Sequence, residues 1–141
     1  MSTQANKTSM RAIAEEAFQQ GNTRVLDEVV AVDYVEHFPV PPGWPAGLAG
    51  LKQFIEVTRA AFPDLQYVVE DLVAEDDKVV ARITASGTQT GPFMMLPPTG
   101  RRATWTEIHI ARFAGGKMVE HWASHDQLGM LQQLGAIPSI A

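Results

Sequence analysis

Apolar residues in the first half of the chain recur every three or four positions, a spacing typical of helices that bury one face. Gly21 and Pro63 end two of these runs, because glycine often follows a last helical turn and proline cannot continue one. The pattern predicts three helices, at residues 10–20, 23–30 and 51–62. The first eight residues are polar, and we expect them to be disordered.

The segment between the second and third predicted helices lacks helical spacing. Residues 34–38 favour a short extended piece, and the proline- and glycine-rich stretch 39–47 that follows must be a loop. Trp44 lies in this loop, which could form the lid or rim of a binding site.

Beyond Asp64 apolar and polar residues alternate, which indicates strands with one buried face. Two strands are predicted at 65–75 and 78–90, and two more flank a turn at 114–117. A last helix follows at 127–134. This order of elements predicts an α+β fold, in which helices pack on one face of a curved sheet. The order is helices first, then a meander of four antiparallel strands, then a last helix.

The predicted hairpin at 105–126 carries the most unusual side chains. Neighbouring strand residues point to opposite faces, so Trp105, Glu107 and His109 share one face of its first strand. One face of its second strand holds Met118, Glu120, Trp122, Ser124 and Asp126. If the two faces coincide, the combined surface suits a pocket better than a plain core.

Composition narrows the function classes. The 141 residues, with 45% hydrophobic and 19% charged side chains, fit one globular domain over 1–141. A net charge of −5 argues against nucleic acid or an anionic membrane as a partner. The absence of cysteine excludes disulfides and thiolate catalysis. No apolar run is long enough to span a membrane, and no secretory signal is evident, so we expect a soluble cytoplasmic protein.

Asp126 has two possible roles. It directly precedes the last predicted helix, where an aspartate is a favoured N-cap. It also shares a strand face with Trp122, and a carboxyl group held against a tryptophan in a pocket suits a general acid or base. The two roles predict opposite shifts of the Asp126 pKa.

Three histidines lie in the same hairpin. His109, two residues from Glu107, could orient a substrate carbonyl or relay a proton, or it could be a core histidine bonded to a backbone carbonyl. His121 and His125 are four residues apart on a strand, and no third ligand has metal-site spacing, so we expect no metal. A serine-hydrolase triad from Ser124, His125 and Asp126 is disfavoured because strand neighbours face opposite ways.

Other polar residues leave alternatives open. Arg82 in a central strand is either solvent-facing or buried and paired with a carboxylate, for which the candidates are Glu107, Glu120 and Asp126. His37, beside the proline-rich loop, could line a pocket mouth or be exposed. The apolar loop tip Phe93-Met94-Met95-Leu96 should pack on the core or cover a ligand.

Short sequence words spread along the chain resemble one known family, the SnoaL-like polyketide cyclases. They are FPD at 62–64, GTQTG at 87–91, PPTGR at 97–101, GGK at 115–117, E-H-W…D at 120–126 and QLG at 133–135. The ordered set covers residues from about 8 to 137. The resemblance implies a cone-shaped α+β barrel of the nuclear-transport-factor-like superfamily, with one apolar cavity and often a homodimer formed through the outer sheet face.

The resemblance also implies an activity, the intramolecular aldol condensation that closes a ring of a polyketide ester, with neither metal nor cofactor. The family's acid/base aspartate matches Asp126, and a histidine on the preceding strand falls near His109. Many relatives carry histidine where this chain has Gln89, so one polar contact should differ. Residues expected to contact an apolar or aromatic ketone or ester are His37, Trp44, Arg82, Gln89, Met95, Trp105, Glu107, Glu120 and Trp122.

Fold similarity alone does not determine function, and two other classes fit the same cone. One is a different acid/base enzyme, such as a ketosteroid-type isomerase or an epoxide hydrolase with Arg82 between Glu107 and Asp126. The other is a non-catalytic small-molecule binding or dimerisation module in which Asp126 is only a helix cap.

Overall fold

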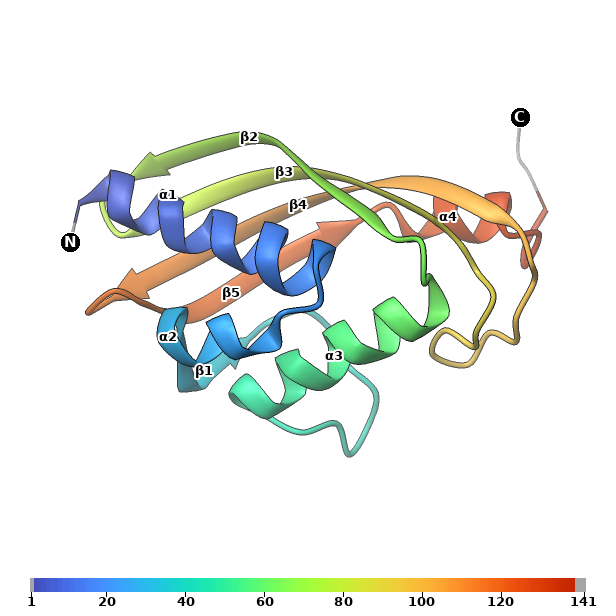
Figure 1. Ribbon diagram of the computed structural model, residues 1–141, viewed down its shortest axis with the longest axis horizontal. Coiled ribbons are helices and arrows are strands. Elements are labelled where there is room, and N and C mark those ends of the chain that lie inside the picture. The colour runs from blue at the N-terminus through green and yellow to red at the C-terminus, as the bar shows by residue number, and fades with distance from the viewer. Residues whose placement is uncertain (1, 139–141) are drawn as a thin grey trace.

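A computed structural model describes residues 2–138 of the chain. Its strands form one sheet, and its helices lie around that sheet (Figure 1). The elements are α1 Thr3–Ala12, η1 Ile13–Gln19, η2 Thr23–Val25, α2 Leu26–Val29, β1 Val30–Glu36, α3 Gly47–Ala61, β2 Gln66–Glu75, β3 Lys78–Thr88, β4 Arg102–Ala114, β5 Lys117–His125 and α4 Gln127–Gln133.

The sheet is curved and open, with the strand order β1-β5-β4-β3-β2. The meander from β2 to β5 is antiparallel, as the alternation predicts. A fifth strand, β1, extends the predicted extended piece and pairs parallel to β5. The expected α+β class is confirmed, but the sheet is neither wholly antiparallel nor closed into a barrel, because β1 and β2 form its two edges.

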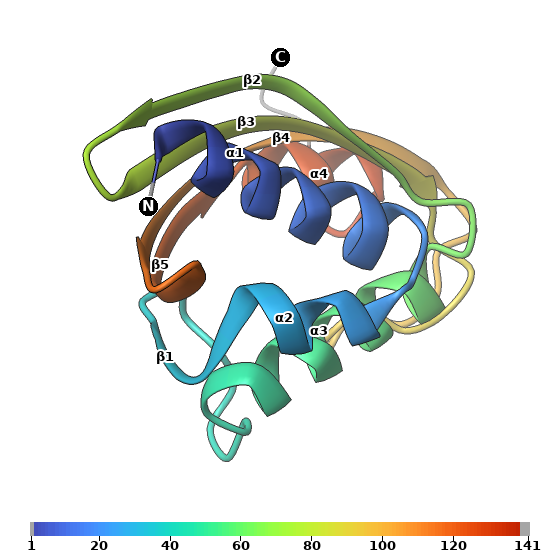
Figure 2. The same ribbon diagram turned by 60° about the vertical axis from the view of Figure 1, so that its left-hand side comes forward.

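The helices cover the concave side of the sheet. Figure 2 shows α1 lying along the inside of the curve, with α2 and α3 below it and a space between them. One continuous core joins α1, η1 and α3 to the inner faces of the strands. The concave side is therefore the place where side chains from every layer meet.

The described part of the chain enters a helix at Thr3, which corrects the expectation that residues 1–8 are disordered. Ser2 caps α1, its Oγ accepting a hydrogen bond from the Ala5 amide at 3.0 Å. Asn6 is buried, so polar composition did not mean exposure. Residue 1, also covered by that expectation, and the last three residues of the apolar tail lie outside the described residues.

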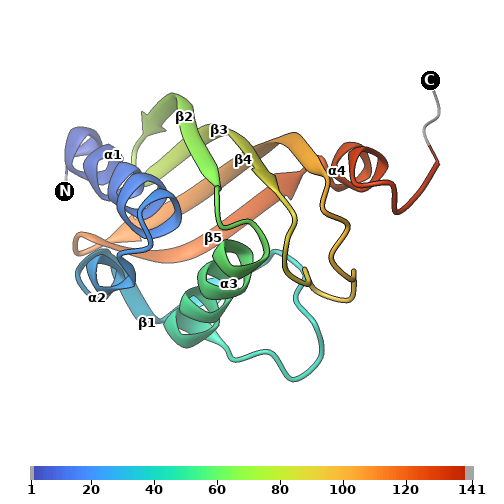
Figure 3. The ribbon, with the colours of Figure 1, turned by 45° about the vertical axis from the view of Figure 1, so that its right-hand side comes forward.

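α3 begins four residues earlier than its apolar spacing predicts, because two glycines allow close backbone contact. A Cβ at Gly47 would lie 2.2 Å from the Val32 carbonyl oxygen, and one at Gly50 would lie 2.0 Å from the Pro45 carbonyl oxygen. The first turn of α3 can thus press against β1 and the proline-rich loop. Figure 3 shows that loop passing beneath α3 on its way from β1.

A β-bulge in the β4–β5 hairpin decides which side chains face inward. Arg112 pairs with Glu120 and Phe113 with Met118, so Val119 is an extra residue in β5. The inner face of β4 holds Trp105, Glu107 and His109, as predicted. On β5 the bulge reverses the parity, and the inner residues after it are His121, Ala123 and His125. The predicted coincidence of these β4 residues with Glu120, Trp122 and Asp126 on one surface is wrong.

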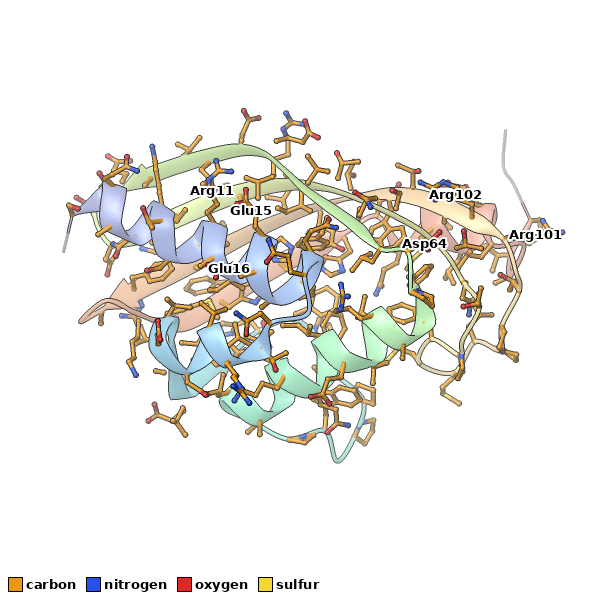
Figure 4. All side chains as sticks on the ribbon, in the orientation of Figure 1. Arg11, Glu15, Glu16, Asp64, Arg101 and Arg102 are labelled. Atoms are coloured by element: carbon orange, nitrogen blue, oxygen red, sulfur yellow. The ribbon has the colours of Figure 1, made fainter. Side chains whose placement is uncertain are left out.

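Surface charges secure the outer corners of the fold. Asp64, expected to cap the corner between helix and strand, accepts hydrogen bonds from the Thr88 amide at 2.7 Å and the Thr88 hydroxyl at 2.8 Å. Those two bonds keep the pKa of the Asp64 carboxyl below its usual range. Arg102 lies 3.6 Å away, and the two side chains lie near one another at the edge of the molecule in Figure 4.

Candidate active site

The concave side encloses a cavity of about 480 Å³. α1, η1 and α3 provide mostly apolar walls, including Met10, Phe18 and Phe54, and the strands provide the remainder. Exposed lining residues, such as Asp33 and Val40, indicate that the cavity opens beside β1 and the proline-rich loop. Its size and apolar character suit a small organic molecule.

One wall of this cavity is polar and forms a continuous chain of hydrogen bonds across three strands. Glu36 on β1 contacts His121 Nδ1 through Oε2 at 2.6 Å. His121 Nε2 lies 2.9 Å from His109 Nδ1, and His109 Nε2 lies 2.8 Å from Glu107 Oε1. Two carboxylates therefore end the chain and two imidazoles form its middle.

Proton counting constrains this polar chain. Each of its three contacts joins two atoms that both carry lone pairs, so each needs one bridging proton. Two neutral imidazoles supply only two protons. With both imidazoles neutral, one of the three contacts therefore has no bridging proton. Burial lowers the pKa of His121, although its hydrogen bond with Glu36 acts in the opposite direction.

Each carboxylate has further donors. Glu36 accepts from the Tyr34 hydroxyl at 2.9 Å and the Phe38 amide at 3.1 Å. Glu107 accepts from the Tyr67 hydroxyl at 2.5 Å and from Trp105 Nε1 at 2.8 Å. Both carboxylates are thus tied to two neighbouring groups besides a histidine.

These contacts determine the charge of the carboxylates. Burial acts to raise the pKa of Glu107, but the hydrogen bond from His109 and the nearby His125 and Tyr67 outweigh it and lower the pKa to about 2. Burial also opposes ionisation of Glu36, and the His121 contact outweighs it, so its pKa is lowered as well. Both groups are ionised at neutral pH.

The two tyrosines stay neutral. Burial, reinforced by the adjacent Glu36 carboxylate, raises the pKa of Tyr34. Burial and the Glu107 carboxylate raise the pKa of Tyr67 in the same way. Tyr67 also stacks on Phe18, with ring centroids 4.6 Å apart, which joins the polar wall to the apolar one.

His125 stands beside this chain without joining it. Its Nε2 is buried, has no hydrogen-bond partner among the described residues, and lies 3.4 Å from Glu107 Oε1. The ring packs against Phe38 with centroids 4.4 Å apart. Burial lowers the pKa of His125 to about 4, although the Glu107 carboxylate acts in the opposite direction. The imidazole is therefore neutral at pH 7.

Asp126 lies outside the cavity lining. It is exposed and caps α4, with Oδ1 accepting from the Gly129 amide at 2.9 Å. Of the two roles that the sequence left open, the structure displays the helix cap. No described contact links the Asp126 carboxylate to the polar wall.

Three more of the expected contact residues form a separate group on the outer face. His37 Nε2 lies 2.7 Å from Glu120 and the ring stacks on Trp122, with centroids 4.9 Å apart. Glu120 also accepts from Arg112 at 2.9 Å. The His37 bond, followed by the Arg112 bond, lowers the pKa of Glu120. The bulge explains why this group lies outside the cavity.

Arg82 takes the solvent-facing alternative. Its Nε donates to Asp71 at 2.7 Å across the β2–β3 pair, and about half of the side chain is exposed. The predicted pairing of Arg82 with Glu107, Glu120 or Asp126 is wrong, because Arg82 lies on the outer face of β3.

The side chain of a buried glutamine forms hydrogen bonds that hold the loop between β3 and β4 in place. Gln89 is fully buried and donates to the Leu96 and Pro97 carbonyls, while its oxygen accepts from Thr99. It organises the loop and is not part of the cavity lining. Met95 at the loop tip is 98% exposed, so it forms no apolar wall.

Trp44 and His109 are the expected site residues that do line the cavity. Trp105 and Glu107 lie behind this wall, around a smaller adjoining space. Sequence reasoning missed Tyr34 and Glu36. The available signal was their spacing of two in the extended piece 34–38, which places both side chains on the same face of a strand. It assigned no site role to His121 and His125, because a bulge leaves no clear mark in a sequence.

Within residues 2–138, Glu107, His109 and His125 form a group whose residue types could hold a metal ion. Their ligand atoms lie within 4.8 Å of one another. Glu107 Oε1, however, already accepts from Tyr67 and contacts His109 Nε2, so two of the three ligand atoms are engaged in hydrogen bonds. The geometry fits a hydrogen-bonded cluster better than a metal centre.

Comparisons with known proteins agree with this architecture. The family described as SnoaL-like polyketide cyclase matches residues 8–134. Nogalonic acid methyl ester cyclase of Streptomyces nogalater is 30% identical over 120 residues, covering 84% of this chain and 90% of the relative. Aklanonic acid methyl ester cyclase DnrD of Streptomyces peucetius is 30% identical over 129 residues, covering 85% of this chain and 84% of the relative.

Solved structures give the same result. TsrD of Streptomyces laurentii superposes with a TM-score of 0.88 at 32% identity, covering 97% of this chain and 99% of that one. IdmH of Streptomyces antibioticus superposes with a TM-score of 0.79 at 36% identity, covering 92% of this chain and 98% of that one. The chain belongs to the SnoaL-like polyketide cyclase family. None of the helices in the described part of the chain is long and apolar enough to cross a membrane.

Proposed function

We propose that this protein catalyses the intramolecular aldol cyclisation of a small polyketide ester inside the concave cavity. The observation that carries the proposal is one apolar cavity of about 480 Å³ with a single hydrogen-bonded polar wall, in a chain of the cyclase family. The apolar walls suit a carbon skeleton, and the polar wall suits its carbonyl groups.

The reaction needs only a proton carrier and a shaped cavity. A base removes the acidic proton from the carbon between two carbonyls, and the resulting enolate is stabilised by those carbonyls. The enolate carbon then attacks a second carbonyl, and the proton is returned to the new alkoxide oxygen. Proton and charge balance, so the cyclisation consumes no co-reactant.

The family resemblance suggests Asp126 as this base and His109 as a donor to the developing oxyanion. Asp126 caps α4 away from the cavity lining, and both ring nitrogens of His109 are in hydrogen bonds. We therefore propose that the base belongs to the cavity wall, and that His109 acts through the electrostatics of the polar chain. The Asp126 assignment remains as the rival that the experiment below separates.

The test is hydrogen–deuterium exchange into a panel of β-keto esters in heavy water, followed by mass spectrometry. Exchange requires only the first proton abstraction, so the natural substrate need not be known. The proposal expects exchange by the wild type well above buffer, and ring closure when nogalonic or aklanonic acid methyl ester is supplied. No exchange across the panel would contradict it and favour a non-catalytic binding module.

The epoxide-hydrolase alternative loses its main support. That reading needs Arg82 between two carboxylates, whereas Arg82 is paired with Asp71 on the outer face. Incubation with a panel of epoxides, with diol products measured, provides the check. Diol formation above buffer would restore the alternative.

We also propose a homodimer through the outer face of the sheet. Exposed apolar side chains on that face include Val68, Val73 and Ile108. Sedimentation of the wild type should give the dimer mass, and Ile108→Arg should shift the population toward monomer. A monomeric wild type at micromolar concentration would contradict this proposal.

A further inference from the structure

The proposed function leaves open which group carries the proton, and the hydrogen-bond pattern of the cavity wall identifies a candidate. Glu36, His121, His109 and Glu107 are held in the polar chain, and Tyr34 and Tyr67 donate to its ends. A substrate could use any of these groups only by breaking a bond that is already made.

Two acid/base groups of the lining have no such bond among the described residues. Asp33 is exposed at the cavity opening, where a carboxylate is fully solvated and water competes for the proton. His125 is enclosed, with only 10% of its side chain exposed. An enclosed neutral imidazole with a free lone pair is the better-placed base.

The orientation of His125 is suited to this task. Nε2 is the buried nitrogen and lies 3.4 Å from Glu107 Oε1, close to the carboxylate charge but not hydrogen-bonded to it. Nδ1 is not among the buried nitrogens without a partner, and it is the nitrogen left for a molecule in the cavity. Packing of the ring against Phe38 restricts its movement. The nearby Glu107 carboxylate can stabilise a His125 imidazolium through its charge, as carboxylates do in histidine–carboxylate pairs.

We propose that His125 is the catalytic acid/base residue of this protein and that Glu107 is its positioning residue. His125 Nδ1 takes the proton from the carbon between the two substrate carbonyls, and the C–H electron pair becomes the enolate. After the new carbon–carbon bond forms, Nδ1–H gives the same proton to the alkoxide oxygen. The Glu107 carboxylate stabilises the positive imidazolium between these two steps.

The surroundings of His125 keep it neutral until substrate supplies the proton. The ionisable groups that face it are Glu107 and His109 from β4, His121 from β5 and Glu36 from β1. Burial and the two histidines disfavour the protonated form, and the two carboxylates favour it, with burial the strongest influence. At pH 7 the lone pair on Nδ1 is consequently free.

The experiment compares His125→Gln with His37→Gln in the β-keto ester exchange assay. His37 is a matched control, because it is a histidine in the same molecule but outside the cavity lining. We expect His125→Gln to lower the exchange rate at least about 100-fold, a typical general-base contribution. We expect His37→Gln to stay within about twofold of the wild type. A melting curve for each variant checks that it is folded.

A cavity variant keeps the proposal testable if glutamine perturbs the fold. His125→Ala should be inactive alone and should recover exchange when free imidazole is added, with a pH dependence that follows imidazole. Glu107→Gln should move the acidic limb of the pH profile of exchange, a readout that a purely structural role would leave in place.

The inference rests on the proposed function, and the two fail differently. Wild-type exchange that persists in His125→Gln overturns the role of His125 and leaves the cyclase proposal standing. Absence of wild-type exchange on the whole panel overturns both. Loss of exchange in His125→Ala without rescue by imidazole, in a folded protein, contradicts the acid/base role.

Discussion

The two faces of the β4–β5 hairpin carry the same kinds of side chain and differ in what those side chains can do. The inner face joins Glu107, His109 and His121 in a buried chain beside the cavity. The outer face joins His37, Glu120 and Trp122 in a partly exposed cluster. Residue type alone therefore does not mark a site here, because burial and access to the cavity make the difference.

The most severe way to break this comparison is to delete Ala123, which lies beyond the bulge. If the bulge stays, His125 turns outward, and if the bulge is lost, Glu120 turns inward and His121 outward. We expect this deletion to abolish cooperative folding, as measured by far-ultraviolet circular dichroism during urea titration. Deletion of Val119 is the control and should fold, because Glu120 then follows Met118 without a bulge and His121 stays inside. A wild-type transition in the Ala123 deletion would show that the parity of β5 does not matter for folding.

Replacing one carboxylate on each face gives the next largest effect. Glu107→Gln removes a buried charge that holds three donors, and we expect a loss of about 3 kcal/mol in the free energy of unfolding. Glu120→Gln is its outer counterpart and should leave the urea midpoint almost unchanged, because exposed ion pairs contribute little. Equal losses for the two variants would contradict the distinction between the faces.

The pH dependence of stability separates the faces in a third way. The pKa of His125 is about 4 in the folded protein and about 6.5 in the unfolded chain, so between these values the unfolded chain binds more protons. The contribution of His125 to stability should fall by about 3 kcal/mol as the pH drops through this window. Below the window, the lowered pKa of Glu107 adds a further decline. His125→Gln should remove this part of the decline. His37→Gln should retain it, and a decline unaffected by His125→Gln would refute the assignment.

The smallest expected effect is on the helix cap. Asp126→Ala should cost about 1 kcal/mol in the free energy of unfolding, because the Gly129 amide loses its acceptor. Asp126→Asn, which can still accept that bond, should be close to the wild type. Guanidinium titration of both variants measures the difference. A large loss in the asparagine variant would mean that the carboxylate charge has a further partner.

Periodicity predicted most of the fold. Alternation identified β2 to β5, and turn residues located the hairpins, because both signals are local in the sequence. The helical start at Thr3 was missed because its buried face includes Asn6, a polar residue. The pairing of β1 with β5 joins segments about 85 residues apart, which no local pattern records.

The site was less predictable for a related reason. His109, Glu107 and Trp44 were found because their types and positions were unusual for a core. His125 was passed over because the parity of β5 was assumed to run unbroken from the turn. The bulge at Val119 reverses that parity, and it depends on how two strands pair rather than on the letters of either.

The most direct test of this account compares His125→Gln and Asp126→Asn side by side, measuring deuterium incorporation into a single β-keto ester at pH 7. These residues are neighbours in sequence, yet one lines the cavity and the other caps α4. We expect exchange to fall at least about 100-fold in the first variant and to stay near wild type in the second. The reverse result, with exchange lost only in Asp126→Asn, would contradict it.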